Sequence, residues 1–179
     1  PLIYNFSGVW GNNEVSMLLL ILILFLFNFL FALSRRISER FKEITVAVQS
    51  IMIFGFVAFL FFLSNPFALN QNNFFDGIGL NPILQDPLLA IHPPVLYVGY
   101  VGFSLVFSLA IAGLSTKEVD QQWASIVKPW VFSAWAFLTA GIALGSFWAY
   151  YELGWGGYWF WDPVENVSLM PWIAATALI

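Results

Sequence analysis

The sequence contains no cysteine and few charged residues. Only 9% of its 179 residues are Asp, Glu, Lys or Arg, and there is a single histidine. The absence of cysteine excludes disulfide bonds, thiolate metal sites and a thiol nucleophile from this chain. Because soluble globular domains carry about 25% charged residues, the low charge excludes an ordinary soluble protein. The six basic residues form no patch that would predict a nucleic-acid partner.

Long apolar runs take the place of charge. The chain is 60% hydrophobic and 20% aromatic, and a helix needs about 20 apolar residues to cross a bilayer. Four windows are this long, and a fifth begins near Pro171: residues 17–33, 44–63, 93–113 and 129–148. We therefore predict an all-α fold, a polytopic transmembrane helix bundle with about five spans, which forms a single membrane domain over residues 1–179.

The basic residues predict the orientation of these spans. Lys and Arg concentrate in short loops on the cytoplasmic or matrix side of a membrane. All six lie in two loops, with Arg35, Arg36, Arg40 and Lys42 after the first span and Lys117 and Lys128 after the third. The opposite side carries six carboxylates and no basic residue: Glu14, Asp76, Asp86, Glu152, Asp162 and Glu165. Residues 149–170 are therefore expected on the outer face, with a lipid membrane around the spans.

The outer-face stretch "WGGYWFWDPVEN", residues 155–166, ends with the spacing of a helix start. Asp162 suits an N-cap, Pro163 suits the first helical position, and Glu165 suits the position that reaches back to the cap. Capping is one interpretation of the two carboxylates. Participation in a binding site is the other.

Consecutive aromatic residues flanked by glycine make up the rest of this stretch. The aromatic residues are Trp155, Tyr158, Trp159, Phe160 and Trp161, and the glycines are Gly154, Gly156 and Gly157. An aromatic belt is one explanation, because Trp and Tyr are enriched where a chain meets lipid headgroups. The interspersed glycines favour another, a flat platform that a planar apolar ligand can approach closely. Haem, a quinone and a lipid headgroup all fit this description.

The single histidine lies in "LQDPLLAIHPPVLYVGY". Asp86 followed by proline predicts a helix start, and His92 followed by two prolines predicts a break, because a residue before proline is disfavoured in a helix. The third span then begins at about Pro93, with His92 near its outer end. Imidazole is a common ligand of haem iron, although a histidine hydrogen-bonded within the bundle is the alternative. A bis-histidine site would need a second imidazole from another chain or segment.

Two glycines in "GIALG" predict close packing of the fourth span. Gly141 and Gly145 lie on one helix face, where small residues let helices approach each other. Trp130, Trp135 and Trp148 are interpreted as bundle or interface residues. We expect packing rather than chemistry from all five residues.

The run "WAYYELGWGGYWFWDPVENVSLMPW" resembles the tryptophan-rich WWD signature of haem-handling membrane proteins. Its ending "DPVEN" is similar to that of the CcmF-type haem lyases of cytochrome c biogenesis. Two further segments, "DPLLAIHPPVLYVGYVGFS" and "PLIYNFSGVWGNNEVSMLLL", also resemble that family. The resemblance covers essentially the whole chain, as an N-terminal part of such a protein, with residues 149–170 as the WWD segment.

The resemblance implies a function in cytochrome c maturation. Such proteins accept haem from a carrier on the outer face, hold it at the WWD segment, and help join its vinyl groups to the cysteine thiols of apocytochrome c. The chain would then be a component of a haem lyase, an enzyme that needs other fragments or subunits as partners. A haem carrier or exporter without lyase activity and a structural subunit of a membrane complex remain the alternatives.

The resemblance also implies a set of binding residues. His92 matches an axial ligand of a transmembrane haem b, and the WWD segment would hold a second, transient haem. The cofactor-binding residues expected on this basis are His92, Trp155, Gly156, Gly157, Trp159, Trp161, Asp162 and Glu165. No general acid or base is identified, although Asp162 and Glu165 are the nearest candidates.

The further histidines expected of the family are absent from this chain. The sequence therefore predicts either a truncated chain or a protein that is naturally split into pieces. The resemblance implies that split versions of the family occur in mitochondrial genomes, and the many Phe, Ile, Leu and Asn residues are compatible with an AT-rich organellar code. Both points favour the mitochondrial inner membrane, with the WWD segment toward the intermembrane space. A bacterial plasma membrane, with this segment in the periplasm, is the alternative.

Overall fold

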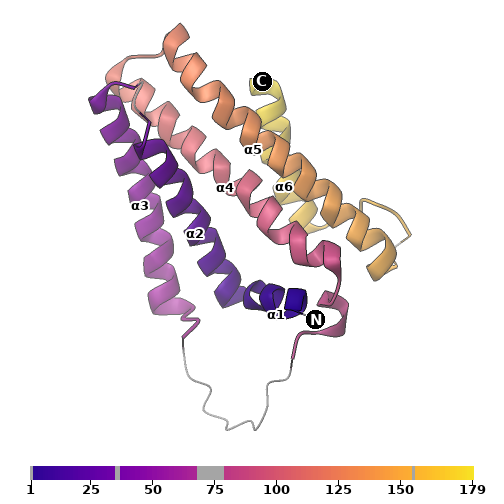
Figure 1. Ribbon diagram of the computed structural model, residues 1–179. Coiled ribbons are helices and arrows are strands. Elements are labelled where there is room, and N and C mark those ends of the chain that lie inside the picture. The colour runs from indigo at the N-terminus through magenta and orange to yellow at the C-terminus, as the bar shows by residue number, and fades with distance from the viewer. Residues whose placement is uncertain (1, 35–36, 68–78, 155) are drawn as a thin grey trace.

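The computed structural model describes residues 2–34, 37–67, 79–154 and 156–179. Its α-helices, in chain order, are α1 (Leu2–Ser7), α2 (Asn13–Ala32), α3 (Glu39–Leu63), α4 (Pro87–Thr116), α5 (Gln121–Trp148) and α6 (Pro163–Leu178). Short 3-10 turns, η1 (Gly8–Trp10) and η2 (Pro82–Leu84), precede α2 and α4, and a π-helical turn, η3 (Ala149–Leu153), follows α5. In the bundle, α4 contacts α2 and α3 on one side and α5 on the other, and α6 packs mainly on α5 (Figure 1).

The prediction of a polytopic helical bundle is confirmed. Four of the helical segments are long and apolar enough to cross a membrane: Val15–Ala32, Glu39–Leu63, Pro87–Thr116 and Gln121–Leu153. They contain most of the four predicted windows. The expected fifth span corresponds to α6, which has 16 residues and is not among the four spans found in the described part of the chain.

Side-chain oxygens fix where several helices begin. Asp86 accepts hydrogen bonds from the backbone of Leu88 (2.8 Å) and Leu89 (3.1 Å) at the start of α4. Asp120 accepts one from Trp123 (2.8 Å) at the start of α5. Such N-caps satisfy backbone donors that have no partner within the helix. The helix start predicted at Asp86 is therefore confirmed.

The break predicted at His92 is wrong. Helix α4 runs without interruption through Pro93 and Pro94, so His92 lies in its second turn. Pro171, where the fifth apolar window begins, also lies inside a helix, because α6 starts at Pro163, as the cap predicted at Asp162 requires. Membrane helices tolerate proline because neighbouring helices and local adjustments satisfy the freed carbonyl groups. Helix packing outweighs the local preference here.

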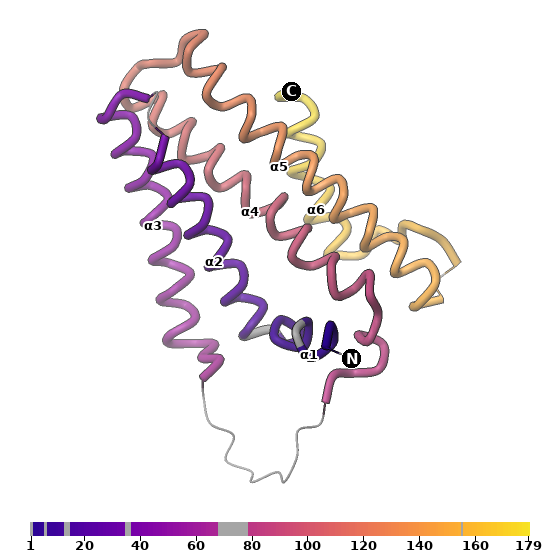
Figure 2. Tube along the Cα trace, viewed as in Figure 1, coloured from indigo at the N-terminus to yellow at the C-terminus, as the bar shows by residue number. Residues whose placement is uncertain are grey.

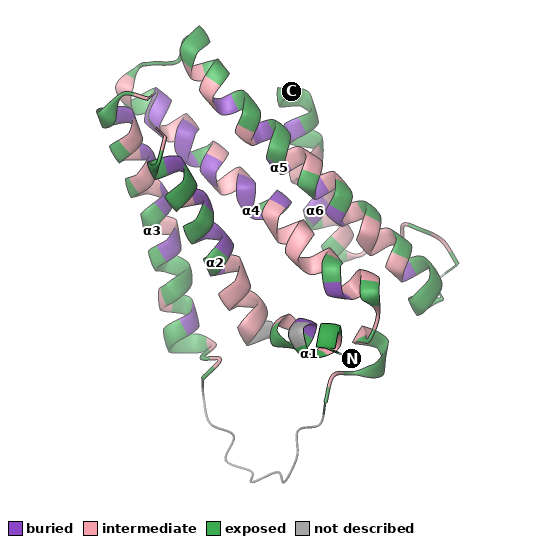
Figure 3. Ribbon diagram, in the orientation of Figure 1, coloured by how far each residue is buried: buried purple, intermediate pink, exposed green. Residues whose placement is uncertain are grey.

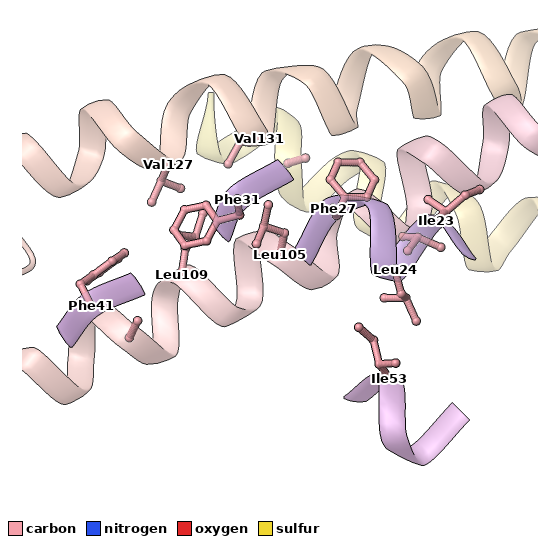
Figure 4. Close-up of a cluster of buried hydrophobic side chains, with 13 residues drawn as sticks. Ile23, Leu24, Phe27, Phe31, Phe41, Ile53, Leu105, Leu109, Val127 and Val131 are labelled. Carbon is pink, nitrogen blue, oxygen red and sulfur yellow. The ribbon is translucent and has the colours of Figure 1, made fainter. Parts of the chain in front are cut away.

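The core lies mainly between α2, α4 and α5, and Phe41 and Ile53 of α3 and Ala175 of α6 also belong to it (Figure 4). Phe31, Leu105 and Leu109 have no exposed surface, and Trp130 meets the Phe31 ring edge-on, with centroids 6.2 Å apart. Figure 3 shows that α4 carries much of the buried surface, whereas the outward faces of α2 and α3 are exposed. These exposed faces are rich in Phe and Leu, as expected for helix faces that meet lipid.

Glycines bring α4 and α5 into backbone contact. A Cβ atom built on Gly99 would collide with the backbone of Leu138, and one on Gly141 would lie 2.6 Å from the Cα atom of Leu96. Side chains larger than hydrogen are therefore excluded at both positions. Close approach through small residues is typical of membrane helices, so the predicted packing role of Gly141 is confirmed.

The start of α3, the end of α4 and the start of α5, where the described basic residues lie, are at the same end of the bundle (Figure 2), and Arg35 and Arg36 lie outside the described residues. The Ser38 hydroxyl, before α3, donates to the Glu118 carboxylate, between α4 and α5, at 3.4 Å. Lys42 forms an ion pair with Glu39 (3.0 Å) in the first turn of α3, directly after the first of these loops. This arrangement confirms that the two loops share one side. The starts of α4 and α6 lie at the opposite end, called the outer end below.

Candidate functional site

A cavity of about 100 Å³ at the outer end brings predicted site residues together. His92 enters it from α4, Trp159 from the loop after α5, and Asp162 and Glu165 from the start of α6. The other lining residues come mostly from α4, α5, η3 and α6: Leu96, Ile142, Gly145, Ser146, Trp148, Ala149, Leu153 and Ser168. Two segments far apart in the sequence therefore form one site.

Helix α5 holds the His92 imidazole in place. Its Nδ1 atom lies 2.8 Å from the carbonyl oxygen of Gly141, and because a carbonyl only accepts, Nδ1 carries the proton. A Cβ atom on Gly145 would lie 2.5 Å from Cε1 and 3.1 Å from Nε2 of the same ring. The predicted packing face of Gly141 and Gly145 is thus confirmed, and at the outer end it packs against His92.

The remaining ring nitrogen of His92 is suited to bind a metal-containing cofactor. Nε2 has no hydrogen-bond partner among the residues that the structure describes, and with the proton on Nδ1 it keeps its lone pair. A hydrogen bond from one ring nitrogen to a carbonyl, which fixes the tautomer, is the usual support of a metal-ligating histidine. Nε2 of His92 is therefore the atom that would hold the iron of such a cofactor.

The two carboxylates form the predicted capping box. The Asp162 side chain accepts from the backbone of Glu165 at 2.7 Å, and Glu165 Oε2 accepts from the backbone of Phe160 (2.8 Å) and Asp162 (3.2 Å). The capping interpretation is confirmed. Both residues also line the cavity, so capping fixes them beside His92 rather than removing them from the site.

Among the described residues of the loop, Trp159 and Trp161 do not form a flat shelf. The planes of Trp159 and Trp161 are nearly perpendicular, at 86° with centroids 5.8 Å apart. Trp159 lines the cavity, whereas Trp161 is 67% exposed and has a left-handed backbone, φ 58°. A stacked pair lies outside the cavity, where Tyr158 packs on Tyr150 with centroids 4.3 Å apart.

The glycines of the loop serve its backbone. Gly154 and Gly156 have positive φ angles, 63° and 85°, which residues other than glycine rarely adopt. Neither they nor Gly157 line the cavity. Their predicted role in ligand approach stays a prediction. Trp155, also predicted to bind the ligand, lies outside the described residues.

Trp148 and the π-helical turn are parts of the site that sequence reasoning missed. The turn η3 supplies Ala149 and Leu153 to the cavity wall, and such turns occur frequently at functional sites. The indole nitrogens of Trp148 and Trp159 are buried without a hydrogen-bond partner within the described part of the chain. Buried donors of this kind are normally satisfied by water or a ligand. The spacing of apolar residues contains no signal for the wider π turn.

Substitutions of Asp162 separate its capping role from a role of its charge. Asp162→Ala removes the N-cap acceptor and is expected to lower stability by about 1 kcal/mol, whereas Asp162→Asn keeps an equally good cap. Thermal unfolding of the complete protein in detergent measures both. If Asn destabilises as much as Ala, the capping role is contradicted. If Asn preserves stability but weakens ligand binding, the charge itself acts in the site.

Comparisons with known proteins identify the family of this chain. A family model described as "Cytochrome C assembly protein" matches residues 10–179. The whole chain matches the cytochrome c-type biogenesis proteins CycK of Rhizobium meliloti (57% identical) and CcmF of Haemophilus influenzae (52%) and Escherichia coli (49%). It spans 27% of the first relative and 28% of the other two, and no solved structure matches it. The chain belongs to the cytochrome c assembly protein family.

Proposed function

We propose that this chain holds haem on the outer face of a membrane during cytochrome c maturation. The observation that carries this proposal is the cavity that joins His92 to Trp159, Asp162 and Glu165. His92 would hold the haem iron, and Trp159 would provide the apolar wall beside it. The three relatives are named as cytochrome c-type biogenesis proteins. Their names support a role of this site in cytochrome c maturation.

A single haem is assigned to His92 and the WWD segment together. The sequence predicted two haems, a transmembrane haem b on His92 and a transient haem at residues 149–170. Because His92 shares its cavity with Trp159, the geometry supports one outer-face haem that both contact. The separate transmembrane haem b stays a prediction, and its ligands would have to come from outside this chain, which has no second histidine.

The residues of this chain form one wall of the binding site. Pockets that enclose a drug-sized ligand have volumes of about 300–1,000 Å³, and this cavity has about 100 Å³. The rest of the site would therefore come from segments that the longer relatives have in addition to the part matched here, or from separate chains. When bound, haem supplies the vinyl groups that react with cysteine thiols. His92, Trp159 and the capped start of α6 would orient the haem ring. Orientation of two bound reactants, here haem and the thiols, contributes strongly to the rate of their reaction.

The proposed partners follow from this role. They are a haem carrier that delivers the ring, apocytochrome c that receives it, and the remaining fragments or subunits of the haem lyase. Bacterial relatives favour the plasma membrane, with the site in the periplasm. The mitochondrial inner membrane, predicted from the sequence, stays the alternative. No residue of this chain is assigned to the bond-forming step.

Haem stoichiometry in the complete protein tests the proposal. We expect His92→Ala and Trp159→Phe to weaken binding of the same haem, seen as loss of one absorbance spectrum in oxidised and reduced samples. Trp123→Phe is the control, because its indole donates to Leu109 at the inner end and should leave the spectrum unchanged. Loss of two different haems by the two site variants would restore the two-site prediction. Absence of any haem would favour the structural-subunit alternative.

A further inference from the structure

Helices α5 and α6 carry the same short pattern, Trp-x-x-x-Thr, at Trp135–Thr139 and Trp172–Thr176. The Trp135 indole donates to the Thr176 hydroxyl at 2.9 Å, and the Trp172 indole donates to the Thr139 hydroxyl at 2.7 Å. Each hydroxyl donates in turn to the tryptophan carbonyl of its own helix, at 2.7 Å in α5 and 2.8 Å in α6. The four bonds form a closed ring, which we call the indole–hydroxyl clasp.

The clasp is reciprocal because α5 and α6 run in opposite directions, α5 toward the outer end and α6 away from it (Figure 1). The Trp135 and Trp172 rings stack within it, with centroids 6.1 Å apart and planes at 24°. Each threonine hydroxyl both donates and accepts, so its hydrogen is already committed to a carbonyl of its own helix. The ring closes only when Trp135 faces Thr176 and Trp172 faces Thr139, so it defines one register of α6 against α5.

The clasp lies on the face of α6 that reaches the cavity. Glu165 and Ser168 line the cavity, and Trp172 and Thr176 follow at spacings of three and four residues, which place all four on one helix face. A slip of one residue would shift α6 by about 1.5 Å and rotate it by about 100°. Such a slip would turn Glu165 out of the cavity and change the support of the loop that carries Trp159.

The clasp supplies side-chain hydrogen bonds that join α6 to α5. Among the described residues, these two indole bonds are the only hydrogen bonds between side chains of α5 and α6. On the opposite side, an apolar cavity of about 360 Å³ lies between α6 and the helices α2, α3 and α4. It is lined on the α6 side by Val167, Met170 and Pro171. Packing on that side therefore leaves room for α6 to move.

We infer that the indole–hydroxyl clasp is a positioning device, which sets the register of α6 and thereby holds Asp162 and Glu165 against the His92 cavity. This inference rests on the proposed function, because it assigns the clasp to the same haem site. The four residues of the clasp do not line the His92 cavity. They act only through the position of α6. They are positioning residues for haem binding.

A cross-link between α5 and α6 measures the register directly. Ser146 and Ser168 line the cavity from these two helices, and the chain contains no cysteine. The pair Ser146→Cys and Ser168→Cys, placed in the complete protein in membranes, is treated with a short bifunctional thiol reagent. In this background Thr139→Val with Thr176→Val removes both hydroxyl groups, Thr139→Ser with Thr176→Ser retains them, and Trp123→Phe removes an indole bond at the inner end.

The Val variant is expected to lower the cross-linking rate about tenfold, since two interhelical hydrogen bonds of ordinary strength are lost. In the protein without the added cysteines, the same variant should weaken haem binding by a similar factor. The Ser variant and Trp123→Phe should match the parent in both measurements. A Val variant that keeps the parent cross-linking rate, or a Ser variant that loses it, would overturn the inference.

The two proposals fail in different ways. If His92→Ala leaves the haem spectrum unchanged, the proposed function is wrong, whatever the cross-linking result. If His92→Ala removes the spectrum while the Val variant binds haem like Trp123→Phe, the proposed function stands and the clasp has no positioning role.

Discussion

Replacing His92 by glycine is expected to abolish the haem absorbance of the complete protein, and free imidazole is expected to restore it. The Gly141 carbonyl accepts from Nδ1 at 2.8 Å, and Gly145 packs against the ring, so the truncated side chain leaves a preformed space for imidazole. Loss of the ligand should weaken binding more than the about 10- to 100-fold typical of losing a partner that only orients a ligand. Haem titration by absorbance, with and without imidazole, measures this.

Gly145→Ala provides the matching control for the position of the ring. Its Cβ atom would lie 2.5 Å from Cε1 of His92, so the imidazole must shift while its chemistry stays unchanged. We expect weaker haem binding than in the parent protein, but stronger than in His92→Gly. Failure of imidazole to restore the spectrum of His92→Gly, with the protein still folded, would show that His92 is not the iron ligand.

Gly99→Ala and Gly141→Ala are expected to cause the largest loss of stability. Each Cβ atom would enter the backbone of the facing helix, Leu138 in one case and Leu96 in the other. Because backbone cannot rotate away as a side chain can, α4 and α5 must separate. Overpacking of this kind costs about 1–3 kcal/mol, and separation of the helices also removes the Gly141 carbonyl from His92.

Gly55→Ala is the control for helix propensity. Gly55 lies inside α3 and a Cβ atom there would meet nothing within 4 Å. Alanine should therefore leave the free energy of unfolding unchanged or raise it by about 0.5–1 kcal/mol, as expected when glycine is removed from a helix interior. Unfolding of the three variants in detergent, followed by circular dichroism, tests this order. Equal stability of all three would contradict the close contact between α4 and α5.

Helix starts were predicted from the sequence because they depend on neighbouring residues. Asp86 and Asp162 each accept backbone hydrogen bonds within three residues, and Glu165 completes the capping box. The same local reasoning failed at Pro93, where helix packing outweighed the preference of the residue before proline. Near Pro171 hydropathy marked only the apolar part of the last helix, whose start was predicted correctly from the capping box at Asp162.

The residues of the candidate site were predicted one by one from the sequence, but the sequence did not show that they lie together. His92 and Glu165 were each predicted to bind a ligand, but no pattern indicated that they line one cavity. The perpendicular rings of Trp159 and Trp161 also differ from the flat platform that consecutive aromatics suggested. The orientation of the rings depends on the backbone angles of the loop. The positive φ of Trp161 could not be predicted, because tryptophan does not favour a left-handed backbone.

Composition and local spacing by themselves determined that this protein is a membrane helix bundle, because a bilayer requires long apolar helices and caps follow from adjacent residues. The distribution of Lys and Arg also determined which loops share a side. Only the tertiary structure decided that α4 and α5 meet at Gly99 and Gly141, and that α6 returns along α5 through paired tryptophans and threonines. Those contacts join distant residues, so their geometry depends on packing across the bundle, and packing is what places His92 beside Trp159.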